Sequence, residues 1–249
     1  MTLFRLLFPK NMNPEINFDK LTQFLYSIIR KVAIPAGLYI FLLFIVSAAL
    51  YFFGFAGLLG SPEAFLQITD PKELEALFLD NSIEILILNT IITIVLNFFM
   101  SGIYGMILES TYNPFFGIGS ALKIVFSKRG LKVLLFIIVL QTIITALNYF
   151  FALIDLRMVG FAIGVLLQFL TCFTLPAIYV DDKGIFKSIG FRTSVVNSKP
   201  AFYFIILLMA YLLSLSGILF FGIGIIFTLP LSYFTIFCLY LAAKGQFKD

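Results

Sequence analysis

Six long apolar stretches constrain the fold of this chain more than any other feature. They lie approximately at 34–59, 84–107, 131–153, 158–180, 201–219 and 222–243. A helix needs about 20 apolar residues to cross the hydrocarbon core of a bilayer, and each stretch has about that length. Because 61% of the residues are apolar and only 12% are charged, a water-soluble fold could not cover this much apolar surface. We therefore predict an all-α membrane protein, a polytopic bundle of six transmembrane helices in a single integral membrane domain, residues 1–249.

The segments between the stretches fit this division. The segment 60–82 is polar and rich in turn residues, which predicts an outer loop, and IDLR at 154–157 predicts a tight outer turn. The segment 216–224 is rich in glycine and carries no charge. It forms either a bend between two spans or part of one long helix, and the second alternative would leave five spans.

Lysine and arginine are distributed very unevenly over the predicted loops. With six spans, 15 of the 17 basic residues fall on the side of the two termini, and only Lys72 and Arg157 fall on the other. Loops rich in Lys and Arg stay in the cytoplasm during insertion. We therefore predict a multi-pass protein of the cell inner (plasma) membrane with both termini cytoplasmic. We also expect the first span to serve as an uncleaved insertion signal, because no signal-peptide core precedes it.

Each predicted inner loop contains a short amphipathic stretch. The three stretches lie approximately at 18–31, 117–128 and 184–198. Helices of this kind lie in the headgroup layer, where Lys and Arg bind anionic lipid. We therefore predict three cytoplasmic-side interfacial helices, with the bilayer and its anionic headgroups as partners. The candidate headgroup contacts are Lys20, Arg30, Lys31, Lys123, Lys128, Arg129, Lys187 and Arg192.

The tetrapeptide FTLP occurs twice, at 173–176 and at 227–230. Identical tetrapeptides arise by chance in a chain so rich in Phe, Leu and Ile, so the match is weak evidence of duplication. The recurring order of inner helix, span and span is the better candidate for a repeat. Pro176 and Pro230 each remove a helical hydrogen bond one turn earlier, which predicts a kink at each position.

The segment FTLPAIYVDDKGIFKSIGFRTSVVNSKPAFYFIILL resembles part of two families of uncharacterised bacterial six-span membrane proteins. They are the YciC-like family and the membrane domains that sometimes precede glycerophosphodiester phosphodiesterase domains. The segment is similar to the junction between their fourth and fifth spans. The last span, which ends in FCLYLAAKG, also looks similar. The resemblance implies six spans and carries no catalytic motif. The matching positions are Pro176, Asp181 or Asp182, Gly184, Arg192, Ser194 and Pro230.

Polar side chains within the spans form stripes on three of the predicted helices. Thr90 and Asn97 share a face of the second span, Gln141 and Thr145 share a face of the third, and a G-x-x-x-G motif precedes Gln168 in the fourth. Two interpretations stay open: hydrogen bonds that pack the helices together, or a binding site near the membrane midplane. The candidate midplane layer consists of Asn97, Gln141, Gln168, Tyr211 and Tyr233.

The composition of the chain gives little support to a catalytic function. The chain has no His and two Cys, which removes the usual acid–base residue and the usual metal ligands. We expect no enzymatic activity, no cofactor, no metal site and no nucleic-acid partner. The sequence favours a non-enzymatic accessory, assembly or lipid-organising component, with a membrane-protein partner or a second copy as further candidate partners. The alternative is a small-solute or lipid transporter with its site in the midplane layer.

Overall fold

The computed structural model describes residues 18–58, 61, 82–182, 184–190, 200–219 and 224–244. The regular secondary structure of these residues is helical, without a strand. Five helical segments among them are long and apolar enough to cross a membrane: Asp19–Leu58, Ser82–Glu109, Lys128–Leu153, Arg157–Asp181 and Ile225–Ala243. The predicted all-α class is therefore confirmed, and the five apolar helices fit a membrane protein, whereas the count of six spans is not confirmed.

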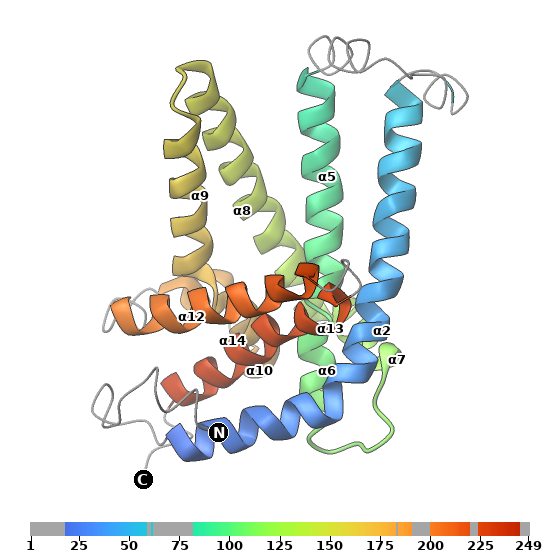
Figure 1. The fold of residues 1–249 in the computed structure, drawn as a ribbon, viewed down its shortest axis with the longest axis vertical. Coiled ribbons are helices and arrows are strands. Elements are labelled where there is room, and N and C mark those ends of the chain that lie inside the picture. Colours follow the sequence, from blue (N-terminus) through green and yellow to red (C-terminus); the bar gives the residue numbers. More distant parts are fainter. Residues whose placement is uncertain are drawn as a thin grey trace.

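The predicted fifth span is too short for a simple crossing. It corresponds to α12, Pro200–Leu215, followed by the 3-10 turn Ser216–Leu219. The 16 residues of α12 extend about 24 Å at 1.5 Å per residue, less than the roughly 30 Å of the hydrocarbon core. In addition, α12 runs across the molecule rather than along the upright helices (Figure 1).

Four upright elements form the upper part of the molecule in Figure 1. They are the second half of α2 (Phe18–Leu58), α5 (Ser82–Met100), α8 (Lys128–Leu153) and α9 (Arg157–Thr171). We use "upper end" for the α8–α9 turn and "lower end" for the connection between α6 (Ile103–Glu109) and α7 (Ile118–Val125). Large apolar side chains cover the outside of the upright helices, among them Phe53 and Leu153, each 66% exposed. Such a surface is stable only in lipid.

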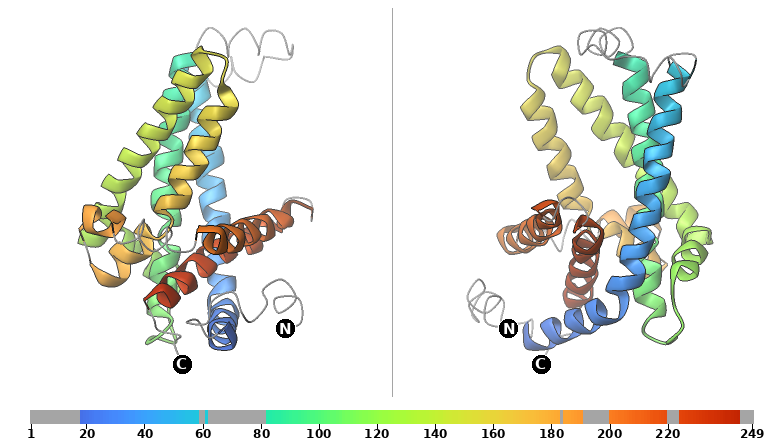
Figure 2. Two further views of the ribbon diagram at one scale, coloured as in Figure 1. Left: turned by 90° about the vertical axis from the view of Figure 1, so that its left-hand side faces the viewer. Right: turned by 45° about the vertical axis from the view of Figure 1, so that its right-hand side comes forward.

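The first predicted interfacial helix and the first span form one continuous helix, α2. Its beginning lies across the lower end, and the helix then turns upward (Figures 1 and 2). Pro35 lies inside it, and proline removes one hydrogen bond of the helical ladder, which lets the helix bend. Leu21 and Ile28 on the predicted apolar face are buried against the protein, while Lys20, Arg30 and Lys31 are exposed.

Both FTLP copies coincide with helix breaks. The first separates α9 from α10 (Thr174–Asp181), and the second separates α13 (Ile225–Thr228) from α14 (Pro230–Ala243). Pro230 stands at the start of α14, where its missing N–H costs no helical hydrogen bond. The kinks predicted from the two prolines are therefore present in the structure.

The predicted second span is also interrupted. It divides into α5 and α6 at Ser101 and Gly102. The Ser101 hydroxyl donates to the Phe98 carbonyl at 2.6 Å, and the Tyr39 hydroxyl donates to the Phe99 carbonyl at 2.7 Å. The Ser101 hydroxyl thus satisfies a carbonyl at the break, whereas the Phe99 carbonyl already accepts from the Gly102 N–H at 2.8 Å and gains Tyr39 as a second donor.

The tight turn predicted at 154–157 is confirmed between α8 and α9. Asp155 adopts the left-handed conformation with φ 56, and the Leu156 N–H bonds the Phe151 carbonyl at 2.8 Å. This is the hydrogen-bonding pattern of a Schellman helix end. Below the turn, Gly160 and Gly164 are buried against Asn148, Phe151 and Ile144 of α8. The G-x-x-x-G motif thus allows close helix packing.

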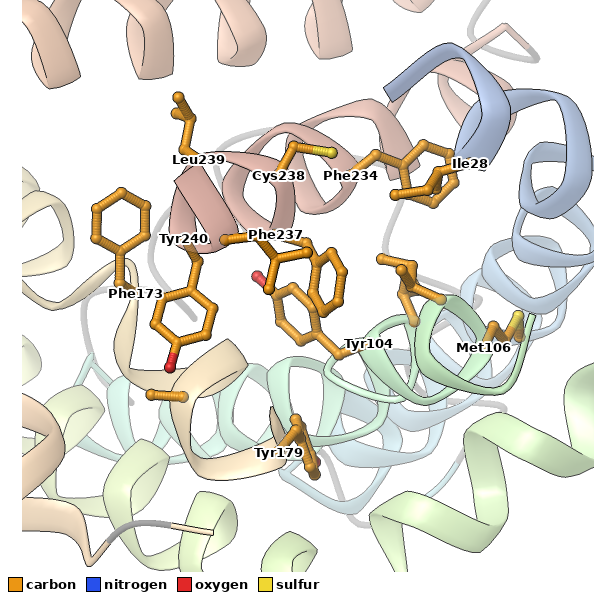
Figure 3. Close-up of a cluster of buried hydrophobic side chains, with 14 of the residues drawn as sticks. Ile28, Tyr104, Met106, Phe173, Tyr179, Phe234, Phe237, Cys238, Leu239 and Tyr240 are labelled. Carbon is orange, nitrogen blue, oxygen red and sulfur yellow. The ribbon is translucent and has the colours of Figure 1, made fainter. Parts of the chain in front are cut away.

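The core of the molecule lies in its lower half, around α14. This helix packs against α2, α6, α10 and α12, and its residues Phe237–Ala242 are buried throughout. Figure 3 shows aromatic rings from several elements converging there, with Tyr104 of α6 beside Phe237 and Tyr240 of α14. The upright helices are held together at this lower end by the crosswise helices.

The other two predicted interfacial helices are described in part. The second corresponds to α7, which ends at Val125 before α8 begins at Lys128. Of the third, 185–190 is helical, with Lys187 exposed, whereas Arg192 lies outside the described residues. The predicted outer loop 60–82 also lies outside them, apart from Ser61 and Ser82.

Candidate functional site

A cavity of about 440 Å³ opens at the lower end, between α6, α7, α8 and α10. Its lining is mixed, with three cationic residues, two carboxylates and several apolar side chains. We call it the basic cavity. It is lined by Gly105, Leu108, Glu109, Tyr112, Ser120, Lys123, Ile124, Ser127, Lys128, Arg129, Tyr179, Val180 and Asp182.

Close packing of α7 on α6 forms one wall of the cavity. Ala121 and Val125 of α7 are buried, and Ile124 lies directly over Gly105 of α6. A Cβ at position 105 would also stand 2.9 Å from the Ser120 carbonyl oxygen, closer than carbon and oxygen approach without repulsion. The absence of a side chain at Gly105 therefore sets the distance between the two helices.

The turn from α7 into α8 places the start of α8 at the cavity. Ser127 is the N-cap of α8, and its hydroxyl accepts a hydrogen bond from the Gly130 N–H at 3.1 Å. A Cβ at position 130 would collide with the Val125 carbonyl, so the turn requires glycine there. Lys128 and Arg129 are consequently the first two residues of a 26-residue helix, at the positive end of its dipole.

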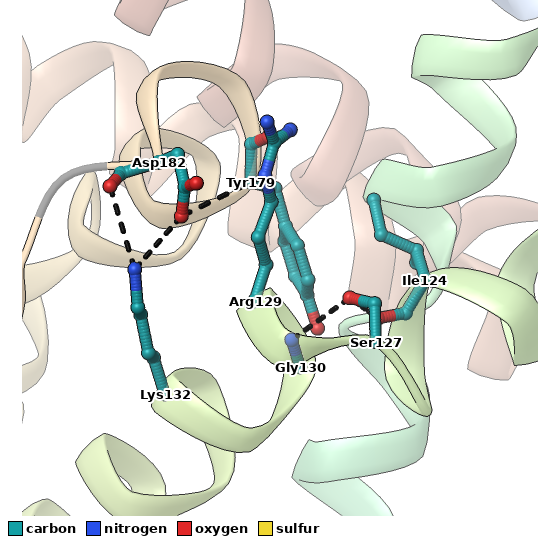
Figure 4. A network of polar contacts seen from close by, with 7 residues as sticks. All are labelled: Ile124, Ser127, Arg129, Gly130, Lys132, Tyr179 and Asp182. Carbon is teal, nitrogen blue, oxygen red and sulfur yellow. Dashed lines mark hydrogen bonds and ion pairs between the residues drawn. The ribbon is translucent and has the colours of Figure 1, made fainter.

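Asp182 joins α10 to α8 across the cavity (Figure 4). Its carboxylate oxygen Oδ1 lies 2.8 Å from Lys132 Nζ and 3.7 Å from Arg129 Nε. The hydrogen bond from Lys132, with the Arg129 charge nearby, lowers the pKa of the Asp182 carboxyl from its ordinary value of 3.8. Asp182 therefore carries its negative charge over the whole physiological pH range.

Arg129 has a second partner on α10. Its guanidinium donates to the Tyr179 carbonyl at 2.6 Å, one of the carbonyls that the end of a helix leaves unpaired. Asp182 follows in the left-handed conformation with φ 52, a common way to end a helix. Arg129 thus stabilises the end of α10 and is held in place at the cavity wall.

The neighbouring carboxylate Asp181 points to the other side of α10. It accepts hydrogen bonds from the Tyr240 hydroxyl and from Lys244, both at 2.5 Å. The two successive acids therefore connect α10 to different helices, Asp182 to α8 and Asp181 to α14. They fix α10 between its neighbours and keep the shape of the basic cavity.

Glu109 at the end of α6 supplies the remaining carboxylate of the cavity. Its Oε1 accepts a hydrogen bond from Asn113 at 3.0 Å, and Lys123 lies close enough to interact with its charge. Arg129 thus forms an ion pair with a carboxylate, whereas the described residues give Lys123 no ion pair within 4 Å. Lys128 is exposed, and the described residues provide it with neither a hydrogen bond nor an ion pair.

The predicted headgroup residues do not all lie together in space. Lys123, Lys128 and Arg129 meet at the basic cavity. Lys31 lies in a separate cavity of about 480 Å³ with Tyr112 and Asn113. Lys20, Arg30 and Lys187 are exposed on other helices of the lower half.

The predicted midplane residues do not form one connected group. Asn97, Gln141 and Tyr233 are half-buried, whereas Gln168 and Tyr211 are exposed. The Tyr233 hydroxyl lies 3.5 Å from the Met100 sulfur, and in the part of the chain that the structure describes no two of these five side chains hydrogen-bond to each other.

Polar contacts between helices occur at other positions than the midplane candidates, and of these Thr90 and Thr145 belong to the predicted stripes. The Thr90 and Thr145 hydroxyls lie 3.1 Å apart between α5 and α8, and the Ser101 hydroxyl lies 2.7 Å from the Tyr179 hydroxyl. The Tyr51 hydroxyl donates to Asn89 at 2.7 Å between α2 and α5. At these positions the polar residues join helices, as the packing interpretation requires.

The ion pairs of the two aspartates were not predicted from the sequence. Asp181 and Asp182 entered there only as positions of the family resemblance. Two carboxylates directly after an apolar run are a usable signal, because acids at the end of a helix need cationic partners. Their partners, Lys132 and Lys244, are about 50 and 60 residues away in the chain, a pairing that no local pattern indicates.

Comparison with known proteins adds no identification. The chain matches no protein-family model, no curated protein and no solved structure.

Proposed function

We propose that this protein is a non-enzymatic, multi-pass membrane component that organises anionic lipid at one face of the bilayer. One observation carries this proposal: the basic residues of the described chain gather at the lower end, where three of them surround a cavity. Exposed aromatic residues lie on the same segments, including Tyr112, Phe115 and Phe126. Aromatic rings and lysines are typical of the layer where headgroups meet acyl chains.

The orientation follows from the same charges. We place the lower end in the cytoplasm and the α8–α9 turn outside, in the inner (plasma) membrane of the cell. In the described part of the chain Arg157 is the basic residue of the upper end, whereas α8 begins at the lower end with Lys128, Arg129 and Lys132. An excess of Lys and Arg on one side is the usual mark of the cytoplasmic face.

We infer six or four crossings rather than five, because the end of α12 and the start of α13 contact each other as a hairpin. Six crossings require α12 and α14 to tilt into a pair of spans, as the resemblance to six-span families implies. Four crossings leave α12 and α14 as a hairpin embedded in the lower half. Both numbers are even, so both keep the two termini on the same side of the membrane.

The transport alternative has less support. It needs the midplane amides to line a shared site, but Gln168 is exposed on α9 and Gln141 is half-buried on α8. The larger cavities of the described residues with charged linings lie at the lower end instead. A role as a partner-binding or assembly factor stays compatible with the exposed apolar face of α12.

Lipid composition around the purified protein tests the proposal. The protein is reconstituted in nanodiscs of phosphatidylcholine with a minor share of phosphatidylglycerol, and the lipids retained after extraction are identified by native mass spectrometry. We expect phosphatidylglycerol to be enriched several-fold over its share in the disc, and the enrichment to decrease with salt. Retained lipid that has the bulk composition of the disc would contradict the proposal.

A further inference from the structure

We propose that the basic cavity is a defined binding site for one phosphodiester headgroup, with one anionic glycerophospholipid bound per chain. This inference rests on the proposed lipid-organising function and goes beyond it. A basic surface attracts anionic lipid without a fixed binding position or a fixed number of bound molecules, whereas a cavity with fixed walls binds one molecule. The chemistry recognised is a single phosphate ester of charge −1.

Positive charge exceeds negative charge at the cavity. Lys123, Lys128 and Arg129 line it together with two carboxylates, and Lys132 shares Asp182 with Arg129. Asp182 and the Tyr179 carbonyl hold Arg129 in place at the cavity wall. Lys128 makes no hydrogen bond or ion pair with the described residues. This excess of positive charge suits the negative charge of a phosphodiester.

The start of α8 adds directional hydrogen-bond donors. The first-turn N–H groups of a helix have no partner in its own ladder. The Ser127 hydroxyl accepts a hydrogen bond from the Gly130 N–H. The N–H groups of Lys128 and Arg129 come before the first bond of the helical ladder, and both residues line the cavity. A phosphate placed there would meet the positive end of a 26-residue helix and the Lys128 side chain together.

The apolar lining favours a lipid over a free ion. Leu108, Ile124 and Val180 line the cavity together with the charged residues. Phe126, at the end of α7, is 72% exposed. A glycerophospholipid can place its phosphate at Lys128 and its first methylene groups against these side chains. Inorganic phosphate or a soluble headgroup would share only the first of these interactions.

The test compares two lysines of the lower end. Lys128→Gln removes from the cavity the charge of Lys128, which has no partner among the described residues. Lys187→Gln removes an equal charge from an exposed position outside the cavity. Binding of phosphatidylglycerol is titrated in nanodiscs and followed by native mass spectrometry. We expect the wild-type protein and Lys187→Gln to retain one phosphatidylglycerol. We expect Lys128→Gln to bind it about five-fold more weakly, the effect of about one lysine near an anionic surface.

Two further measurements distinguish loss of binding from loss of folding, and a lipid ligand from a soluble phosphate ester. Lys128→Arg keeps the charge and is expected to retain the lipid, and thermal unfolding of each variant checks that it folds. Competition with inorganic phosphate and with glycerophosphoglycerol, the soluble headgroup, is expected to leave the bound lipid in place. Displacement at equal concentration would show a site for a soluble phosphate ester and overturn the lipid assignment.

The remaining outcomes distinguish this inference from the function on which it rests. Equal losses of phosphatidylglycerol in Lys128→Gln and Lys187→Gln would show diffuse attraction. They would overturn the defined site and leave the lipid-organising function standing. No enrichment of phosphatidylglycerol in the wild-type protein would contradict both.

Discussion

At the scale of single residues, the two successive aspartates at the end of α10 have different roles. Asp181 is only 10% exposed in its ion pair with Lys244, whereas Asp182 is 51% exposed in its pair with Lys132. Exposed ion pairs contribute little to stability. The value of Asp182 therefore lies in positioning Arg129 and the end of α10 at the basic cavity.

The Asp182 contacts predict a pH-dependent contribution to stability. Because the folded protein lowers the pKa of this carboxyl below 3.8, the contribution is complete above that value and is lost as the pH falls through the lowered pKa. We expect Asp182→Asn to have a lower Tm than the wild-type protein at pH 7, and the difference to vanish at the acidic end of a pH series. Asp155→Asn, at an exposed turn that accepts Asn, is the control. A pH-independent difference for Asp182→Asn would argue against this origin.

The Thr90–Thr145 contact predicts a measurable coupling between α5 and α8. The Thr90 hydroxyl donates to the Leu86 carbonyl at 2.7 Å, so Thr145 is the donor in the 3.1 Å contact between the two hydroxyls. Hydrogen bonds between membrane helices contribute about 0.6–2 kcal/mol. A double-mutant cycle with Thr90→Val and Thr145→Val, read by unfolding in detergent, is expected to give a coupling in this range. Additive effects would exclude the bond.

At the scale of elements, helix breaks decide the architecture more than helix lengths do. Three of the predicted spans appear as two helical segments each: α5 with α6, α9 with α10, and α13 with α14. The prolines Pro176 and Pro230 explain two of these breaks. The third occurs at Ser101 and Gly102, where the Ser101 hydroxyl bonds the Phe98 carbonyl and lies 2.7 Å from the Tyr179 hydroxyl of another helix. Proline is visible in a sequence, whereas a contact with a distant tyrosine is not.

The packing of α7 on α6 predicts opposite outcomes at two glycines. Gly105→Ala would place a methyl group against Ile124 and the Ser120 carbonyl, and we expect it to destabilise the protein by about 1–3 kcal/mol through overpacking. At Gly119 an added Cβ meets no atom within 4 Å, so Gly119→Ala is expected to be neutral or slightly stabilising. Unfolding in detergent measures both. Equal effects would show that the close approach at Gly105 does not matter.

At the scale of the whole molecule, the number of membrane crossings depends on the crosswise helices α12 and α14. Thr228 donates to the Ser214 carbonyl at 2.6 Å, and Gly217 packs directly on the backbone of Gly224 and Ile225. The end of α12 and the start of α13 therefore form a compact hairpin. Its position relative to the membrane distinguishes four crossings from six.

Cysteine labelling tests this topology at four positions. In a background with Cys172→Ala and Cys238→Ala, single cysteines replace Ser61, Leu156, Phe186 and Ser216. We expect an impermeant thiol reagent added to intact cells to label positions 61 and 156 but not 186. Labelling of 186 from outside would invert the proposed orientation. Labelling of 216 indicates six crossings, and protection of 216 until the membrane is permeabilised indicates four.

The sequence by itself determined that the chain is helical and apolar enough for a membrane. Apolar runs of bilayer length are local properties, so they can be read without coordinates. The helical breaks at both FTLP copies and the turn at 154–157 followed for the same reason, since proline and a four-residue connection act through the local backbone.

Only the tertiary structure decided which polar residues meet. It gathered Lys123, Lys128 and Arg129 around one cavity and laid α12 across the upright helices. These arrangements depend on contacts between residues far apart in the chain, such as Lys132 with Asp182 and Lys244 with Asp181. The energy of such a contact depends on how several helices pack at once, so no single segment carries the information.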